Sequence, residues 1–309
     1  MKINIVMSTY NGEKYLAEQI ESIRNQTFSN WTLLIRDDGS RDATPEIIRA
    51  FAKQDDRIRF INDGQTDNYG VIKSFYHLVK YESADYYFFS DQDDVWLPEK
   101  LAITLKRAEE ENDHKPLLVY TDLKVVNQDL IVLQDSMIRS QSHHANIELV
   151  QELTENTVTG GTMMINRALA DKWQVYEGLL MHDWYLALLA SALGKLVYID
   201  QPTQLYRQHE ANVLGARTWT KRMKNWLKPN QLITKYWWLI TSSQEQAKKL
   251  LLFELSDSIE QVVIAYLDLM NRSLLDRWKL MRQFGFRKNR LFHTIIFKTL
   301  VITKWGYRP

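Results

Sequence analysis

Residues 86–100 read YYFFSDQDDVWLPEK, and they give the clearest indication of the architecture. The apolar run at their start predicts a buried strand, and Pro98 predicts the first turn of a helix soon after it. Asp91, Asp93 and Asp94 therefore follow the end of a strand, where open α/β sheets bind ligands. Clustered carboxylates need a cation or hydrogen bonds to hold them, and they suit a hard divalent ion. A solvated acidic loop is the alternative interpretation.

The N-terminal third of the chain alternates between short apolar runs and segments with helical spacing. Strands are predicted at 3–8, 31–36, 58–61 and 86–89, and helices at 13–25, 45–54, 70–80 and 98–110. This βαβα order predicts an α/β fold with a mostly parallel sheet, whose strands end at one common edge.

Polar turn segments follow the first two predicted strands. Residues 8–11 (STYN) offer hydroxyl and backbone N–H groups that could meet a nucleotide, or they form a simple strand-to-helix turn. Residues 37–40 (DDGS) offer carboxylates that could accept a hydrogen bond from the N3–H group of a uracil or thymine ring. An Asx turn that caps the next helix is the alternative. Because the acidic cluster is expected at the same edge, we favour ligand binding.

The predicted secondary structure changes twice along the rest of the chain. Strands are predicted at 117–122, 158–165, 196–200 and 203–207, and a helix at about 182–193. From about residue 217 the pattern is wholly helical, with apolar residues at helical spacing in 258–284 and apolar runs in 290–305. We therefore expect an α/β domain over residues 1–216 and a helical C-terminal region over residues 217–309.

Charge divides the chain at the same place. The net charge is +1, but residues 217–309 hold 18 of the 39 Lys and Arg and 6 of the 38 Asp and Glu, a net charge of +12. Six of the ten Trp also lie there, at positions 219, 226, 237, 238, 278 and 305. Such a region could lie on an anionic membrane, form a bundle or dimer surface, or bind nucleic acid. We favour the membrane, with some helices packing on the α/β domain, and we expect no nucleic acid.

Several classes of protein are excluded or disfavoured. The sequence has no Cys, which excludes disulfides and thiolate metal sites and favours a reducing compartment. No apolar stretch reaches the roughly 18–20 residues of a spanning helix, and we expect no signal peptide before the first strand. Neither the dinucleotide-binding motif G-x-G-x-x-G nor a P-loop is present. We therefore expect a cytoplasmic protein.

Five motifs, in this order and spacing, resemble the glycosyltransferases of family 2, which are inverting enzymes with the GT-A nucleotide-sugar-binding fold. They are residues 8–11 (STYN), 26–28 (QTF), 37–40 (DDGS), 68–70 (NYG) and 91–96 (DQDDVW). The resemblance covers about residues 1–215. The DQDD form, the chain length and the basic C-terminal region look most like bacterial rhamnosyltransferases of the α-1,3 type, which build cell-wall polysaccharide from dTDP-rhamnose.

The resemblance implies roles for the residues expected at the sheet edge. Asp38 would bind the base of the donor, with Thr9 and Asp37 beside it. Asp93 would ligate Mg²⁺ or Mn²⁺, which neutralises the diphosphate as the sugar–phosphate bond breaks. Asp91 would hold the donor sugar or the ribose.

Further implied roles fall in the second half of the chain. Gly161, in the sequence TGGT, would let the backbone pass close beneath the donor sugar and the acceptor. Asp183 would be the general base that takes a proton from the acceptor hydroxyl, although His182 stands where the family usually has Glu. A carboxylate that only complements the helix N-terminus is the alternative. His209 would complete the metal shell or is a loop histidine, and Arg207 could meet phosphate.

We therefore expect an inverting enzyme that moves rhamnose from dTDP-rhamnose to a hydroxyl of a growing, lipid-linked surface polysaccharide. It would lie peripherally on the inner face of the cell membrane, with a homo-oligomer as one option. Another UDP- or dTDP-sugar is the nearest alternative. A nucleotidyltransferase would have a Gly-rich basic loop after the first strand, which STYNGE lacks. A non-catalytic carbohydrate-binding protein is disfavoured by the intact acids Asp91, Asp93 and Asp183.

Overall fold

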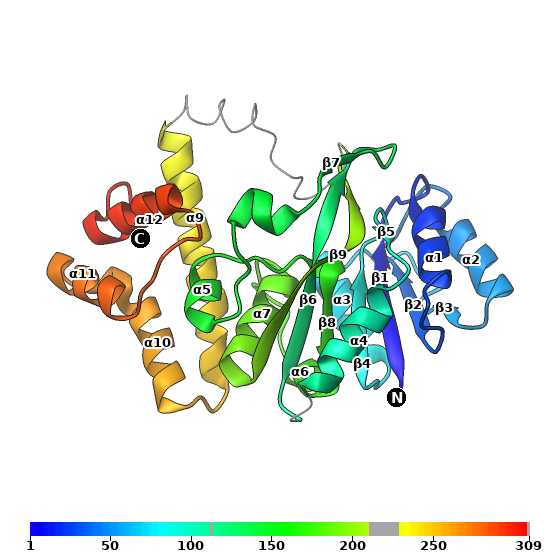
Figure 1. Cartoon of the computed structure of the whole chain (residues 1–309), viewed down its shortest axis with the longest axis horizontal. Helices are drawn as coiled ribbons and strands as arrows, with labels where there is room; N and C mark the ends of the chain where they lie inside the picture. Colours follow the sequence, from blue (N-terminus) through cyan, green and yellow to red (C-terminus); the bar gives the residue numbers. More distant parts are fainter. Residues whose placement is uncertain (112–113, 210–228, 308–309) are drawn as a thin grey trace.

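The computed structural model describes residues 1–111, 114–209 and 229–307 (Figure 1). The strands are β1 Ile3–Thr9, β2 Thr32–Asp37, β3 Ile58–Phe60, β4 Tyr86–Ser90, β5 Val95–Trp96, β6 Leu117–Val126, β7 Val132–Gln134, β8 Met163–Asn166 and β9 Lys195–Arg207. The α-helices are α1 Leu16–Arg24, α2 Thr44–Gln54, α3 Val71–Tyr81, α4 Lys100–Glu110, α5 Leu149–Thr154, α6 Arg167–Lys172, α7 His182–Leu193, α9 Pro229–Lys248, α10 Asp257–Leu267, α11 Leu274–Gln283 and α12 Leu291–Thr303. The predicted boundary at 216/217, Trp219 and Trp226 lie outside the described residues.

The described strands form one sheet in the order β3-β2-β1-β4-β8-β6-β9-β5, with β7 paired to β6. The pairs β1–β2, β1–β4, β2–β3 and β6–β9 are parallel, and β8 runs antiparallel to both of its neighbours. The predicted α/β fold with a mostly parallel sheet is therefore confirmed. Its first four strands come from consecutive βα units, as the apolar runs predicted.

Two hydrophobic cores cover the two faces of the sheet, because side chains along a strand point alternately to opposite faces. In β1, Ile5 and Met7 join a core that includes residues of α1, α2 and α4, whereas Val6 joins the other core. That second core includes residues of α3, α5, α6 and α7, and it continues into α9, α10, α11 and α12. The helical C-terminal region therefore shares a core with the α/β domain.

The C-terminal helices lie at one end of the molecule, and α1 and α2 lie at the other (Figure 1). The long helix α9 packs against α5 and α7, and α10 to α12 lie on its outer side. Among the described helices, none combines the length and apolar character needed to cross a bilayer. The helical pattern predicted for 258–284 is interrupted, because Ser273 accepts a hydrogen bond from the backbone N–H of Asp276 and starts a new helix.

Several predicted elements differ from the structure in their bounds. The strands predicted at 196–200 and 203–207 are one strand, β9, in which the pairing register with β6 shifts between Ile199 and Pro202. The strand predicted at 158–165 is shortened to β8, because the backbone N–H of Thr162 bonds the Thr159 carbonyl and closes a helical turn first. The helix predicted from Pro98 begins only at Lys100.

Candidate active site

Three strand ends meet at the edge where the sequence predicted a binding site. In the parallel ladder Thr9 pairs with Asp37, and Met7 pairs with Ser90, the residue before Asp91. Because these strands are parallel, their carboxyl ends lie at the same edge of the sheet. The predicted residues of β1, β2 and the loop after β4 therefore lie side by side.

Asp37 is buried and holds the turn after β2. Its Oδ1 accepts hydrogen bonds from the hydroxyls of Thr9 (2.9 Å) and Ser40 (2.5 Å), and its Oδ2 accepts one from the backbone N–H of Ser40 (2.8 Å). A carboxylate has about four acceptor positions, so one position on Oδ2 is left for a ligand.

Asp38 is also buried, and most of its acceptor positions are used by the chain. Its Oδ1 accepts from the Arg36 guanidinium (2.5 Å), the backbone N–H of Tyr69 (2.6 Å) and the Ser74 hydroxyl (3.0 Å). Its Oδ2 accepts from the backbone N–H of Gly70 (2.8 Å). The carboxylate thus fastens the loop before α3 to the end of β2, and one position on Oδ2 remains for a ligand.

The acidic loop is tied to the loop after β1 by Gln92. The Gln92 side-chain amide accepts from the backbone N–H of Tyr10 (2.8 Å) and donates to the Tyr10 carbonyl (3.0 Å). A Cβ on Gly12 would lie 2.4 Å from the Gln92 Oε1, so a larger residue there would displace the Gln92 amide from its bonds to Tyr10. The two loops that follow the central strands are therefore held together as one surface.

Asp91 and Asp94 lie in a poorly solvated group. Asp94 is fully buried and accepts from the Gln204 amide (3.0 Å) and the backbone N–H of Arg207 (3.1 Å). Burial raises its pKa well above the usual value, and the charges of Asp91 and Asp93 add to the effect. Burial also raises the pKa of Asp91 to about 7, with contributions from Asp93 and Asp183. An excess of negative charge in such surroundings favours binding of a cation.

Lys100 and Gln204 belong to this cluster as the structure describes it, and the sequence reasoning missed both. The Lys100 Nζ is buried and donates to the Gly161 carbonyl and to the Gln204 Oε1, each at 2.6 Å. Burial lowers its pKa to about 7, although Asp94 and Asp91 act in the opposite direction. A lysine on the otherwise apolar face of α4 was the available signal.

Residues 160–161 connect the acidic cluster to Asp183. A Cβ on Gly161 would lie 3.0 Å from the Asp91 Oδ2 and 3.3 Å from the Asp94 Oδ2. The backbone N–H of Gly160 donates to the Asp183 Oδ2 (3.2 Å). Two successive glycines thus lie against the carboxylates of the acidic cluster and of Asp183, and their lack of side chains allows this close approach.

Asp183 is buried in the first turn of α7. Its Oδ1 accepts from the backbone N–H of Trp184 (2.5 Å) and from the Asn156 amide (3.4 Å). Burial raises its pKa to about 6, and the hydrogen bonds from Trp184 and Gly160 limit the rise. A carboxyl group with a pKa near neutrality is suited to accept a proton from a hydroxyl.

His182, beside Asp183, is buried in an aromatic cage. Its ring centroid lies 4.6 Å from that of Phe75 and 5.7 Å from that of Phe89. Neither ring nitrogen has a hydrogen-bond partner among the described residues, and burial lowers its pKa to about 3. The imidazole is therefore neutral near pH 7. It supplies no positive charge to balance the carboxylate of Asp183.

Asp93 and His209 face one another at the rim of the acidic cluster. The His209 Nε2 lies 2.7 Å from the Asp93 Oδ2, and both side chains are partly exposed. Within the part of the chain that the structure describes, no three His, Asp or Glu side chains are arranged to hold a metal ion by themselves. The predicted metal ligands are thus adjacent, but they form only part of a coordination shell.

Arg207 lies beneath this rim and is almost fully buried. Its guanidinium donates to the backbone carbonyl of Asp93 (3.0 Å), to the carbonyl of Gln128 (2.5 Å) and to the carboxylate of Glu18. It also lies over the Tyr15 ring, 4.5 Å from its centroid. A phosphate contact would require it to give up one of these partners.

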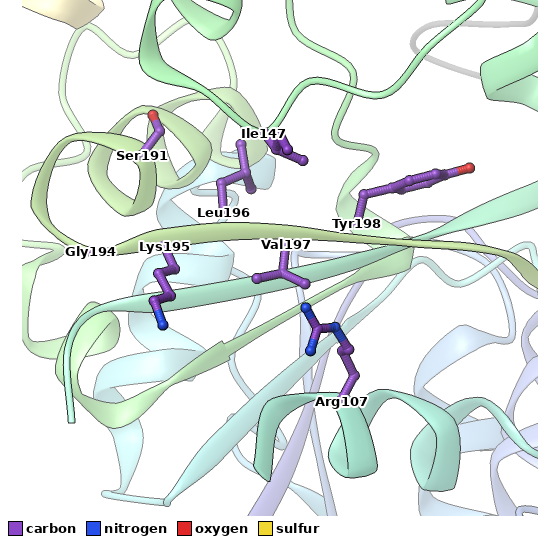
Figure 2. A pocket seen from close by; sticks show the side chains of 8 residues that line it. All are labelled: Arg107, Ile147, Ser191, Gly194, Lys195, Leu196, Val197 and Tyr198. Carbon is purple, nitrogen blue, oxygen red and sulfur yellow. The ribbon is translucent and has the colours of Figure 1, made fainter. Parts of the chain in front are cut away.

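A pocket of about 330 Å³ lies elsewhere on the protein, along the first residues of β9 (Figure 2). It is lined by Gly194 and Lys195 to Tyr198, with Arg107 approaching from α4 and Ile147 and Ser191 on the opposite side. None of the predicted site residues lines it.

Comparison with known proteins identifies sequence relatives of this site. The pattern of glycosyl transferase family 2 matches residues 4–174. The dTDP-rhamnosyl transferase RfbG of Shigella flexneri is 30% identical over 223 residues, which are 68% of this chain and 74% of RfbG. A UDP-Glc:α-D-GlcNAc-diphosphoundecaprenol β-1,3-glucosyltransferase of Escherichia coli, WfgD, is 30% identical over 130 residues, 42% of this chain and 49% of WfgD.

Solved structures resemble the chain over most of its length. S. aureus TarS 1–349 in complex with UDP-GlcNAc superposes with a TM-score of 0.61 at 16% identity, covering 92% of this chain and 80% of that one. The mannosyltransferase PcManGT of Pyrobaculum calidifontis, in complex with GDP-Man and Mn²⁺, has a TM-score of 0.51 at 11% identity, covering 99% and 88%. At such identities the likeness shows the fold, which is the GT-A fold.

Proposed function

Because this chain belongs to glycosyl transferase family 2 and is a glycosyltransferase, we propose that it transfers rhamnose from dTDP-rhamnose to a hydroxyl of a lipid-linked surface polysaccharide, with inversion. The name of the Shigella flexneri relative supports the donor. The name of the Escherichia coli relative, whose acceptor is a diphosphoundecaprenol saccharide, supports a lipid-linked acceptor.

The proposal depends above all on one observation. Residues 160–161 touch Asp91 and Asp94 on one side and Asp183 on the other. A donor lying over this segment would have its diphosphate near the acidic cluster, and Asp183 would lie on its far side. Inversion requires this arrangement, because the acceptor must attack the face opposite the leaving group.

The donor nucleoside would lie at the ends of β1 and β2. Thr9 lines this edge through its bond to Asp37. The remaining acceptor position on Asp38 is suited to the N3–H of a thymine or uracil ring, and that on Asp37 to a hydroxyl of the donor's pentose, which is deoxyribose in dTDP-rhamnose. Asp91, whose pKa burial raises to about 7, would accept a hydrogen bond from the donor sugar or from this pentose.

Asp93 and His209 would hold a divalent metal. Mg²⁺ and Mn²⁺ are commonly held by one or two protein ligands together with substrate phosphates and water, so this oxygen–nitrogen pair fits such an ion. The metal would stabilise the negative charge that develops on the leaving diphosphate. Arg207 could add a phosphate contact by exchanging its bond to Glu18.

Asp183 would act as the general base. Among the described residues, its Oδ2 accepts a long bond of 3.2 Å from the backbone N–H of Gly160, and it retains capacity for the acceptor hydroxyl. As the hydroxyl oxygen bonds to the sugar, its proton passes to Asp183, and the bond between the sugar and the diphosphate breaks. The lack of a side chain at Gly161 lets the Asp91 and Asp94 carboxylates approach the backbone over which the donor sugar would lie.

The C-terminal helices would rest on an anionic membrane. Large apolar side chains are exposed on α11, on α12 and just after it, namely Leu274, Leu275, Trp278, Leu291, Phe292, Ile295 and Trp305. They lie in the region with a net charge of +12. Apolar insertion and attraction of Lys and Arg to anionic headgroups together would hold the enzyme near a lipid-linked acceptor.

The test is incubation of the purified protein with a panel of dTDP- and UDP-sugars, with Mn²⁺ or with EDTA. We expect dTDP-rhamnose to be turned over and EDTA to abolish turnover. Preference for another sugar would overturn the rhamnose assignment but not the transferase. Binding of saccharide without turnover of any donor would instead support a carbohydrate-binding protein on this fold.

A further inference from the structure

Gln246 of α9 reaches from the C-terminal region to the segment that precedes Asp183. Its side chain is fully buried. Its Oε1 accepts hydrogen bonds from the backbone N–H groups of Leu180 (2.8 Å) and Met181 (3.1 Å). These residues directly precede His182, where α7 begins. One side chain of a distant helix therefore holds the chain where it enters the helix that carries Asp183.

The start of α7 receives no bond from the side chain of its own cap residue. The first N–H groups of a helix have no acceptor within the helix, and a Ser, Thr, Asp or Asn cap residue usually supplies one. The cap residue here is Met181, whose side chain makes no capping bond. The bonds to Gln246 fix the extended backbone of Leu180 and Met181, and they thereby fix the direction in which α7 begins.

The C-terminal region, through α9 and the loop before α12, also holds the other segment beside Asp183. The Ser243 hydroxyl donates to the carbonyl of Leu153 on α5, and Lys288 donates to the carbonyl of Thr154. Asn156, two residues after α5 ends, donates to the Asp183 Oδ1. The helical C-terminal region is thus bonded to both segments whose side chains set the position of the Asp183 carboxylate.

We infer that Gln246 is a positioning residue for Asp183, through which the C-terminal region completes the acceptor half of the active site. This inference rests on the proposed role of Asp183 as the general base. A base must lie within hydrogen-bond reach of the hydroxyl it deprotonates, so a small displacement of the start of α7 slows the chemical step. The donor-binding groups lie on β1, β2 and the loop after β4, whereas the hydrogen bonds to the Gln246 Oε1 come from the segment before α7.

The test compares three variants of the full-length protein. Gln246→Met keeps the size of the side chain but removes the acceptor, and we expect kcat to fall on the order of 10- to 100-fold with an unchanged KM for the donor. Gln246→Glu keeps an oxygen acceptor, which the positive end of the helix dipole favours, and we expect it to retain most of kcat. Gln244→Met is the matched control, because the Gln244 amide donates to the Tyr266 carbonyl on α10.

An equal loss of kcat in Gln244→Met, or wild-type kcat in Gln246→Met, would overturn the inference. Thermal unfolding of each variant separates loss of folding from loss of positioning, and Gln246→Glu provides a folded protein if Gln246→Met does not fold. In a double-mutant cycle, Gln246→Met should add no further loss to Asp183→Asn, because it acts through that carboxylate. An additive loss would contradict this. Full activity of Asp183→Asn alone would instead refute the proposed base.

Discussion

The proposed donor edge and the proposed acceptor half of the active site are built in different ways. Thr9, Asp37 and Asp91 lie at the ends of β1, β2 and β4, and the register of these parallel strands brings them together. The Asp183 carboxylate accepts hydrogen bonds from residues 156 and 160. The start of the helix that carries it is held by Gln246 of the C-terminal region. The donor edge is therefore a consequence of the sheet, whereas the acceptor half depends on packing between distant parts of the chain.

The largest expected effect lies at the donor edge. Asp93→Asn should lower the transfer rate on the order of 10³-fold or more, because the metal ligand that stabilises the leaving diphosphate is weakened. Initial rates across a Mn²⁺ series measure this effect, with Asp63→Asn as an exposed control whose partner is Arg49. Near-full activity of Asp93→Asn in EDTA would contradict the metal site.

Removing the proposed base should affect the chemical step without affecting donor binding. Asp183→Asn nearly conserves shape but removes the proton acceptor, so we expect the rate to fall by about 10²–10⁴-fold. Binding of the donor nucleotide, measured by calorimetry, should be unchanged because its contacts belong to the other half. Weakened nucleotide binding would show that Asp183 supports the structure of the whole site.

Substitution of Lys100 should show how much the buried acidic cluster contributes to stability. Lys100→Met leaves the Gly161 carbonyl and the Gln204 Oε1 without their buried donor and removes a positive charge near Asp94, so the free energy of unfolding should fall by about 3 kcal/mol. Urea unfolding of this variant is compared with that of Lys106→Met, an exposed lysine on the same helix. Equal stability of the two variants would mean that the cluster does not need this cation.

The pH dependence of the transfer rate should follow the ionisation of Asp183. The base acts when it is deprotonated, and burial raises the pKa of Asp183 to about 6, so activity is full above this pH and lost as pH falls through it. His182, with a pKa of about 3, stays neutral over this range. The rate at saturating donor, measured from pH 5 to pH 8, should fall about tenfold per unit below the pKa. A rate independent of pH down to pH 5 would argue against this base.

The smallest effect is expected on the outer surface. Leu275→Glu and Leu291→Glu replace two of the most exposed apolar side chains of α11 and α12 with negative charges. Co-sedimentation with anionic vesicles should weaken in both variants, because the new charges oppose insertion and repel the headgroups. It should also weaken at high salt, because each Lys or Arg near the anionic surface contributes about 1 kcal/mol that salt screens. Equal, negligible binding to neutral and anionic vesicles would favour a packing or dimer surface.

The sequence by itself was sufficient for the α/β architecture and for the meeting of Thr9, Asp37 and Asp91 at one edge of the sheet. Apolar runs of strand length fix β1, β2 and β4, and polar turns after each strand must then meet at one edge. The acidic loop was found for this reason. Its neighbour Lys100 was not, because a lysine in a helix is usually solvated and only packing shows that this one is buried.

Only the tertiary structure decided how Asp183 is held. No local pattern links Gln246 to Leu180, 66 residues earlier, since that contact follows from how α9 packs on α7. The same holds for β9, where the break between two predicted strands is only a shift of register in one. Local propensities act over a few residues, whereas burial against a distant surface determines which polar groups lose water and must find a partner in the chain.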